Sequence, residues 1–213
     1  APAAVPPRSL VFLLDVSGSM MDADKLPLLK RSLALLVADL RPEDSVAIVV
    51  YAGASGVVLP PTSGREPGKI LAALERLEAG GSTNGGAGIE LAYALAQQSF
   101  RAGGINRVIL ATDGDFNVGP SSQGALERLI VDKRASGVFL SVFGFGTGNL
   151  QDATMELLGD DARPYIAGLI HCHDSAMLRD AIHGIQAAVT QHCSAGAAKL
   201  LVETVRAAAR LDD

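Results

Sequence analysis

The sequence predicts an α/β domain: a mostly parallel sheet with helices on both faces. Short apolar runs rich in leucine and valine alternate along the chain with longer stretches of helical period. The first run, residues 10–14, is apolar at every position, as expected of a central strand that is buried on both faces. Alternation of this kind is typical of βαβ units, in which helices cover the two faces of one sheet.

Six strands are expected. The first, at residues 10–14, precedes a helix that we expect Asp24 to cap, with Pro27 in its first turn and a leucine-rich stripe reaching Leu40. Pro60 and Pro61 place the third strand at an edge, because proline has no N–H to donate to a neighbour. The other strands are predicted at residues 45–51, 56–62, 107–112, from 137 onward and 164–170, and the other helices at 69–77, 87–100, 124–136, 151–158, 175–190 and 197–211.

Length and composition limit the class of protein. A chain of 213 residues, 48% of them hydrophobic, is enough for one domain with its own core. The formal net charge of −5 argues against a nucleic-acid binder, and no apolar stretch reaches the length of a membrane-spanning helix. The Ala/Pro-rich start predicts a linker over residues 1–8, as in a segment of a longer polypeptide. Two cysteines, Cys172 and Cys193, do not make a disulfide scaffold, and whether they pair stays open.

Three polar loops stand out. They are "DVSGS" at residues 15–19, "GGSTNGG" at 80–86 and "ATDGDFN" at 111–117. The first and third follow predicted strands, and ligands of open α/β sheets bind beyond the carboxyl ends of the strands. In an extended loop alternate residues project the same way, so Asp15, Ser17 and Ser19 can direct oxygens at one point.

The side chains of these loops suit a hard metal ion. Carboxylate and hydroxyl oxygens favour Mg²⁺ or Mn²⁺ over zinc or copper. Two neighbouring carboxylates also repel each other unless a cation lies between them. An ordinary Asx/Ser turn is the alternative interpretation of the first loop, and it loses weight once the other two loops are considered. The candidate metal ligands are Asp15, Ser17, Ser19, Thr83 and Asp113.

The three motifs together resemble the von Willebrand factor type A domain with its metal-ion-dependent adhesion site. That site is written D-x-S-x-S, then a distant Thr, then an Asp in a T/S-D-G turn, and the resemblance covers roughly residues 8 to 190. It implies Mg²⁺ (or Mn²⁺) at those five residues and a Rossmann-like, open, doubly wound sheet of six strands. The strand order would be 3-2-1-4-5-6 with one antiparallel edge strand. The domain would span residues 9–192 and be followed by a C-terminal helical tail at 193–213.

The resemblance also implies a function. Such a domain is a protein-binding module and not an enzyme: a partner's Asp or Glu carboxylate completes the shell of the metal. The stretches "VFLLDVSGSM", "TDGDFNVG" and "VFGFGTGN" resemble a bacterial, envelope-associated subgroup, which implies the periplasmic or extracellular side of the cell envelope.

Two other functions remain open. One is a Mg²⁺-dependent phosphoryl-transfer enzyme of haloacid-dehalogenase type. It is disfavoured because Ser17 stands where a second Asp would be needed as the general acid/base. The other is an assembly or chaperone-like subunit of an ATPase system, which would use the same metal face.

Two further stretches carry weaker signals. "GGSTNGGAG" lacks the Gly-Lys-Ser/Thr ending of a phosphate-binding loop, so no nucleotide site is expected there. All four histidines and both cysteines lie between His171 and Cys193 without the spacing of a zinc site, and we interpret them as a surface segment with isolated thiols. After Gly159 the sequence departs from the subgroup's usual pattern, which leaves the register of the last strand open.

Overall fold

A computed structural model describes residues 6–82, 85–114, 128, 132–133 and 135–145, together with the backbone of residues 166–172. Its centre is a six-stranded sheet of order β3-β2-β1-β4-β5-β6, which confirms the predicted fold class and strand order. All neighbouring strands are parallel except β2 and β3. The strands are β1 (Arg8–Asp15), β2 (Ser45–Tyr51), β3 (Ser55–Ser63), β4 (Ile105–Thr112), β5 (Phe139–Phe145) and β6 (Ile166–Cys172).

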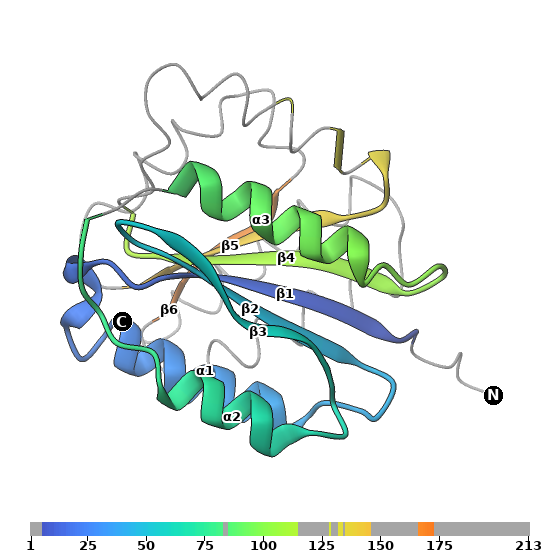
Figure 1. Cartoon of the computed structure of the whole chain (residues 1–213), viewed down its shortest axis with the longest axis horizontal. Coiled ribbons are helices and arrows are strands. Elements are labelled where there is room, and N and C mark those ends of the chain that lie inside the picture. The colour runs from blue at the N-terminus through green and yellow to red at the C-terminus, as the bar shows by residue number, and fades with distance from the viewer. Residues whose placement is uncertain are drawn as a thin grey trace, which may run out of the picture.

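Helices cover both faces of the sheet. Helices α1 (Leu26–Ala38) and α2 (Pro67–Glu75) pack on one face, and α3 (Gly85–Gln98) packs on the other (Figure 1). A short 3-10 helix, η1 (Gly18–Met21), lies between β1 and α1. The predicted helices at residues 151–158, 175–190 and 197–211 lie outside the described residues. Within the described part of the chain, no helix is both long and apolar enough to cross a membrane.

The start of α1 differs from the prediction. Lys25, not Asp24, occupies the cap position, and no side chain caps the helix. A turn in which the Lys25 backbone N–H donates to the Asp22 carbonyl leads directly into the helix. Pro27 lies in the first turn as predicted, where its missing N–H costs no hydrogen bond. This start fixes the backbone of Lys25 close to the end of β1.

Strand β1 serves two apolar cores because its side chains alternate between the faces of the sheet. Leu10, Phe12 and Leu14 belong to the core under α1 and α2. Val11 and Leu13 belong to the core under α3. Every residue of the strand is buried, which explains why residues 10–14 are all apolar before the strand ends at the carboxylate of Asp15.

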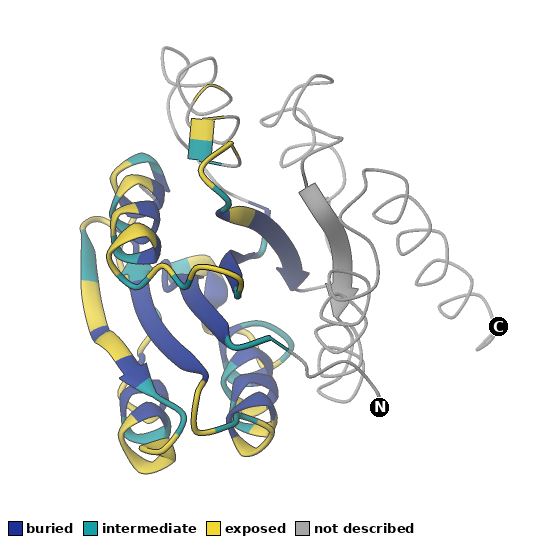
Figure 2. Ribbon diagram, turned by 90° about the vertical axis from the view of Figure 1, so that its right-hand side faces the viewer, coloured by how far each residue is buried: buried dark blue, intermediate teal, exposed yellow. Residues whose placement is uncertain are grey.

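Strand β3 is the antiparallel edge strand, as predicted. Figure 2 shows the central strands buried and this strand largely exposed. Pro60 and Pro61 are both exposed on it, and because proline lacks an N–H it leaves fewer donors for another chain to pair with.

An ionic cluster fixes the opposite end of the sheet, where β1 and β2 begin. Asp44 is fully buried and accepts hydrogen bonds from the backbone and the guanidinium groups of both Arg8 and Arg41. Burial alone would raise the pKa of Asp44, but these hydrogen bonds hold it well below its usual range. Arg41 also donates to the carbonyl of Pro6, so the cluster anchors the chain where it enters β1.

Candidate functional site

The predicted polar loops meet at the carboxyl edge of the sheet. Asp15 and Tyr51 are register partners at the ends of β1 and β2, and β4 ends on the other side of β1 at Thr112. The structure therefore brings Asp15, Ser17, Ser19 and Asp113 to one edge. Thr83, the fifth predicted ligand, lies outside the described residues, as do Asn84 and Asp115.

Asp15 is held in place by donors on both sides. Its Oδ1 accepts from the Ser17 backbone N–H at 2.8 Å. Its Oδ2 accepts from the Tyr51 hydroxyl at 3.1 Å and from Thr112 Oγ1 at 3.2 Å. Thr112 Oγ1 in turn accepts from the Gly114 N–H at 3.2 Å, which ties the third loop to the same network. With no exposed surface of its own, Asp15 is a fixed negative group at the base of the site.

The pKa of Asp15 is raised from its ordinary value. Burial is the largest cause, hydrogen bonds from Ser17 and Tyr51 oppose it, and repulsion from the negative charge of Asp113 adds to it. Burial also raises the pKa of Tyr51 far above its ordinary value, so its hydroxyl stays a hydrogen-bond donor at neutral pH. A cation between the two carboxylates would relieve their repulsion.

The two serines of the first loop present neighbouring oxygens. Ser17 Oγ and Ser19 Oγ are 3.0 Å apart, with Ser17 buried and Ser19 exposed. Oxygens in adjacent octahedral positions about 2.1 Å from one Mg²⁺ also lie about 3.0 Å from each other. At the observed distance the two hydroxyls form a hydrogen bond with each other. The same distance would allow both oxygens to coordinate one ion.

Backbone hydrogen bonds tie the second loop to the first. Gly80 N–H donates to the Val16 carbonyl at 2.7 Å, and Gly18 N–H donates to the Gly81 carbonyl at 3.1 Å. Gly81 has φ +82°, a left-handed conformation that favours glycine, and an added Cβ would approach the Gly53 nitrogen at 3.5 Å. The segment that leads toward Thr83 is thus fixed alongside the Asp15 loop as far as Ser82.

Asp113 is the least satisfied group of the site. Its Oδ2 accepts a hydrogen bond from Lys25 Nζ at 3.0 Å. Its Oδ1 is buried and accepts no hydrogen bond from any residue that the structure describes. A buried acceptor left without a donor costs about 1–3 kcal/mol, so this oxygen favours a cation or a water molecule beside it.

Lys25 connects two of the loops. Besides Asp113, its ammonium donates to the Ser19 carbonyl at 3.0 Å. Burial lowers the pKa of Lys25, but the hydrogen bond to Asp113 and the attraction of nearby carboxylates raise it to above its ordinary value. The ammonium therefore carries its full charge at neutral pH.

The donor set matches the predicted metal chemistry. The site offers two carboxylates and two serine hydroxyls, all of them hard oxygen ligands of the kind that Mg²⁺ and Mn²⁺ prefer. No group of three His, Cys, Asp or Glu residues suited to a metal occurs in the part of the chain that the structure describes. The side chains of the segment from His171 to Cys193 are not among the described ones, so its interpretation stays a prediction.

Sequence reasoning missed three residues of the site. Tyr51 and Thr112 hold Asp15, and Lys25 pairs with Asp113. Tyr51 and Thr112 could have been found by placing the predicted strands in the order 2-1-4, because both then end beside Asp15. The Lys25 contact spans 88 positions and has no signal in the sequence.

Comparison with known proteins supports the predicted family. A sequence model of the von Willebrand factor type A domain matches residues 10–115. The uncharacterized protein YfbK of Escherichia coli is 51% identical over 156 residues, which make up 73% of this chain and 27% of YfbK. The chain thus spans only about a quarter of the length of that relative.

Solved structures support the fold. BatB, a conserved hypothetical protein from Bacteroides thetaiotaomicron, has a TM-score of 0.68 at 20% identity, covering 86% of this chain and 99% of BatB. An aerotolerance-related membrane protein from Bacteroides fragilis has a TM-score of 0.63 at 22% identity, covering 84% of this chain and 98% of that protein.

Proposed function

Because the chain belongs to the von Willebrand factor type A domain family, whose members are typically protein-interaction modules, we propose that it binds its partner through a metal ion. In this proposal Mg²⁺ or Mn²⁺ presents an open coordination position to an Asp or Glu carboxylate of the partner protein. The ion would be held by Asp15, Ser17, Ser19, Thr83 and Asp113.

The observation that carries the proposal is Oδ1 of Asp113, which is buried without a partner among the described residues, at the edge of the sheet where Asp15 and the two serines lie. The ion pair with Lys25 accounts for Oδ2 of Asp113 but supplies no partner for Oδ1. The 3.0 Å spacing of Ser17 Oγ and Ser19 Oγ supports the same assignment, since it suits two ligands of one octahedral ion.

Neutral ligands give the bound ion its function. Hydroxyls from Ser17, Ser19 and Thr83 would leave most of the positive charge on the ion, whereas direct carboxylates would quench it. Asp15 already accepts three hydrogen bonds, which favours contact with the ion through water rather than directly. An ion of this kind attracts an incoming carboxylate more strongly than any neutral side chain.

We propose no catalytic residue. Domains of this family are generally non-enzymatic, and phosphoryl transfer would need a general acid/base beside Asp15. Among the described residues, Asp15 accepts hydrogen bonds from Ser17 and from the hydroxyls of Tyr51 and Thr112, none of which transfers a proton readily at neutral pH.

Location and extent are also proposals. We propose a place in the cell envelope, on the periplasmic or extracellular side, and the likeness to a membrane protein from Bacteroides fragilis supports the association with a membrane. We propose a domain at residues 9–192, a linker at 1–8 and a helical tail at 193–213. An assembly subunit of an ATPase system would present the same metal face to its partner.

Calorimetry with Mn²⁺ tests the metal site. Wild-type protein should bind one ion with modest affinity, because few of the ligands are charged. Asp113→Ala should abolish the binding heat. Glu90→Ala is the matched control, since it removes the same charge from an exposed position on α3. Equal Mn²⁺ binding by wild type and Asp113→Ala would refute the site.

A pull-down from the envelope fraction, with and without EDTA, tests the capture of a partner. EDTA and Thr83→Ala should each release the partner, and truncating its critical Asp or Glu should add nothing to Thr83→Ala, because both changes break one bond. A partner that stays bound despite EDTA and Thr83→Ala would exclude the adhesion mechanism.

A further inference from the structure

The ammonium of Lys25 lies among the proposed metal ligands. We infer that Lys25 is a tethered competitor of the metal ion: it pairs with Asp113 in the metal-free protein and has to leave Asp113 when the ion binds. The inference rests on the proposed metal site and names the residue that lowers the affinity of this site for its ion.

The contacts of Lys25 resemble those of a bound cation. Its Nζ lies 3.0 Å from Asp113 Oδ2 and 3.0 Å from the Ser19 carbonyl oxygen, so it bridges the first and third loops. Asp22 Oδ2, at 3.7 Å, is a more distant and largely exposed third partner. The Lys25 side chain is 20% exposed and that of Asp113 is 5% exposed, so the pair is mostly shielded from water.

The tether keeps the ammonium close to Asp113. The Lys25 N–H donates to the Asp22 carbonyl at 3.0 Å, and the Lys25 carbonyl accepts from the Leu29 N–H at 2.8 Å. The backbone of Lys25 is thus held from both sides, and only its side chain is free to move. Because the backbone of Lys25 is fixed, its ammonium has a high effective concentration at Asp113 and cannot diffuse away from the site.

The ion and the ammonium exclude each other by charge. Both draw on the negative charge of Asp113, and a divalent cation among the serine hydroxyls would repel an ammonium bound to the carbonyl of Ser19. Metal binds only to protein in which Lys25 is not paired with Asp113. The apparent metal affinity is therefore the intrinsic affinity multiplied by the fraction of protein in that unpaired state. Among the described residues Lys25 contacts Oδ2 only, so Oδ1 gives an incoming ion or its water a first contact before charge repulsion drives the ammonium away.

Competition by Lys25 also bears on stability without metal. Because the ammonium compensates Asp113, the repulsion between Asp15 and Asp113 is reduced in the metal-free protein. The same residue should therefore stabilise the metal-free fold and weaken metal binding.

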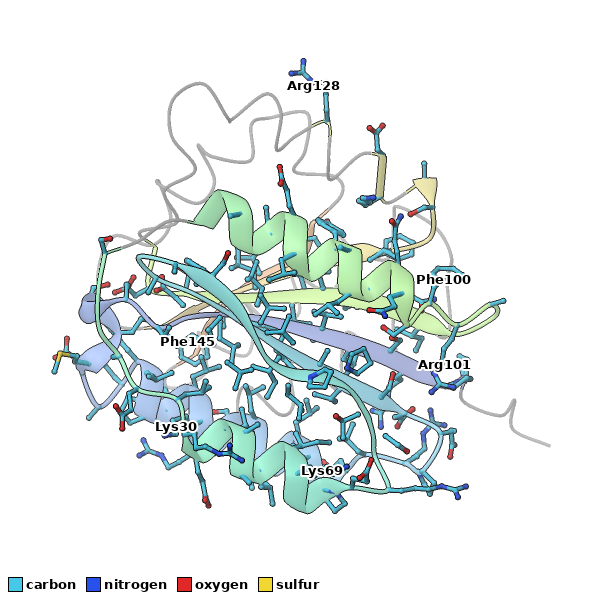
Figure 3. All side chains as sticks on the ribbon, viewed as in Figure 1. Lys30, Lys69, Phe100, Arg101, Arg128 and Phe145 are labelled. Carbon is cyan, nitrogen blue, oxygen red and sulfur yellow. The ribbon has the colours of Figure 1, made fainter. Side chains whose placement is uncertain are left out.

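Calorimetry on Lys25→Met tests this inference. Removing a partly shielded ion pair of ordinary strength should tighten Mn²⁺ binding about fivefold. Lys30→Met is the matched control: Lys30 projects from α1, close in sequence to Lys25 (Figure 3). Among the described residues its Nζ donates to the carbonyls of Glu75 and Leu77 and not to a carboxylate. Its Mn²⁺ affinity should stay within about twofold of wild type, since a surface charge outside direct contact is largely screened by salt.

Urea unfolding in EDTA provides the second measurement. Lys25→Met should lower the free energy of unfolding of the metal-free protein, and a double-mutant cycle with Asp113→Asn should show that most of this loss depends on Asp113. Opposite changes in metal-free stability and Mn²⁺ affinity are the expected signature. Circular dichroism confirms that each variant is folded.

The outcomes separate the two proposals. The lysine inference is overturned if wild type binds Mn²⁺ and Lys25→Met binds it no more tightly, or if Lys30→Met gains as much Mn²⁺ affinity as Lys25→Met. Either result leaves the metal site standing. Binding that appears only in Lys25→Met supports the inference in its strongest form. Absence of Mn²⁺ binding in both wild type and Lys25→Met overturns the metal site, and the lysine inference with it.

Discussion

Two glycines of helix α3 give a sharp test of how closely the helix approaches the site. Gly88 is buried, and an added Cβ would lie 2.9 Å from Tyr51 Cβ and 3.2 Å from Leu13 Cδ1. Tyr51 Cβ is attached to the backbone and cannot swing aside. Gly86, two residues earlier, has nothing within 4 Å of an added Cβ. Gly88→Ala and Gly86→Ala therefore make the same chemical change against different surroundings.

The magnitudes follow from two opposing effects. Alanine in place of glycine stabilises a helix interior by up to about 1 kcal/mol, and by less in the first turn. Overpacking at Gly88 costs about 1–3 kcal/mol. Gly86→Ala should leave the free energy of unfolding unchanged or slightly raised, whereas Gly88→Ala should lower it. Because both variants make the same glycine-to-alanine change, the gain in helix propensity largely cancels between them and the overpacking cost remains. In a domain of this size each kcal/mol shifts the melting temperature by about 2–4 °C, so the two variants should melt roughly 2–12 °C apart.

Thermal unfolding in EDTA, followed by far-UV circular dichroism, measures the difference without any contribution from metal. Mn²⁺ calorimetry on Gly88→Ala adds a functional measurement: a displaced Tyr51 should orient Asp15 less well and weaken the binding. If Gly88→Ala melts at or above the temperature of Gly86→Ala, the close approach of α3 to β1 and β2 is wrong.

Three further outcomes are expected. Tyr51→Phe removes a donor to the buried Asp15 and should lower the free energy of unfolding by about 1.5–3 kcal/mol, measured by urea unfolding, and weaken Mn²⁺ binding. Asp44→Asn should cost about 3–5 kcal/mol at pH 7, because the buried guanidinium of Arg8 and the partly exposed one of Arg41 both lose their carboxylate. The pKa of Asp44 is lower in the folded than in the unfolded protein, so the wild type keeps its advantage over Asp44→Asn above about pH 4 and should lose it as the pH falls further. An equal difference in unfolding free energy between the two proteins at pH 7 and at pH 3 would contradict this. EDTA should lower the melting temperature of wild type by a few degrees at most, since the described core is formed mainly by the strands and helices of the sheet rather than by the loops of the site. Loss of far-UV signal on chelation at room temperature would contradict this.

Much of the fold follows from the sequence because its signals are local. Continuous apolar runs mark strands buried on both faces, and Pro60 and Pro61 mark the edge strand. The start of the first helix was predicted wrongly, since Asp24 has the side chain of a good cap but a backbone turn from Asp22 to Lys25 takes its place. The local sequence offers several such starts, and tertiary packing selects one of them.

The candidate site was predicted only where the motif itself supplies the residues. Asp15, Ser17 and Ser19 alternate in one loop, and Asp113 follows a recognisable strand. Tyr51 and Thr112 reach Asp15 from the neighbouring strands, so their role depends on strand register. The pairing of Lys25 with Asp113 depends on how α1 is seated against β4, which no spacing along the chain encodes.

The central position of β1 has a consequence for the newly synthesised chain. Two of the described donors to Asp15 come from later strands: Tyr51 is added 36 residues after Asp15 and Thr112 only 97 residues after it. Until then β1 has one neighbour instead of two, and its other edge is open to mispairing. Asp113 is added directly after Thr112, so a half-translated domain lacks both the second donor and the second carboxylate. The polar site therefore forms only after ribosomal synthesis has passed the end of β4, and no truncated chain that stops earlier can present it.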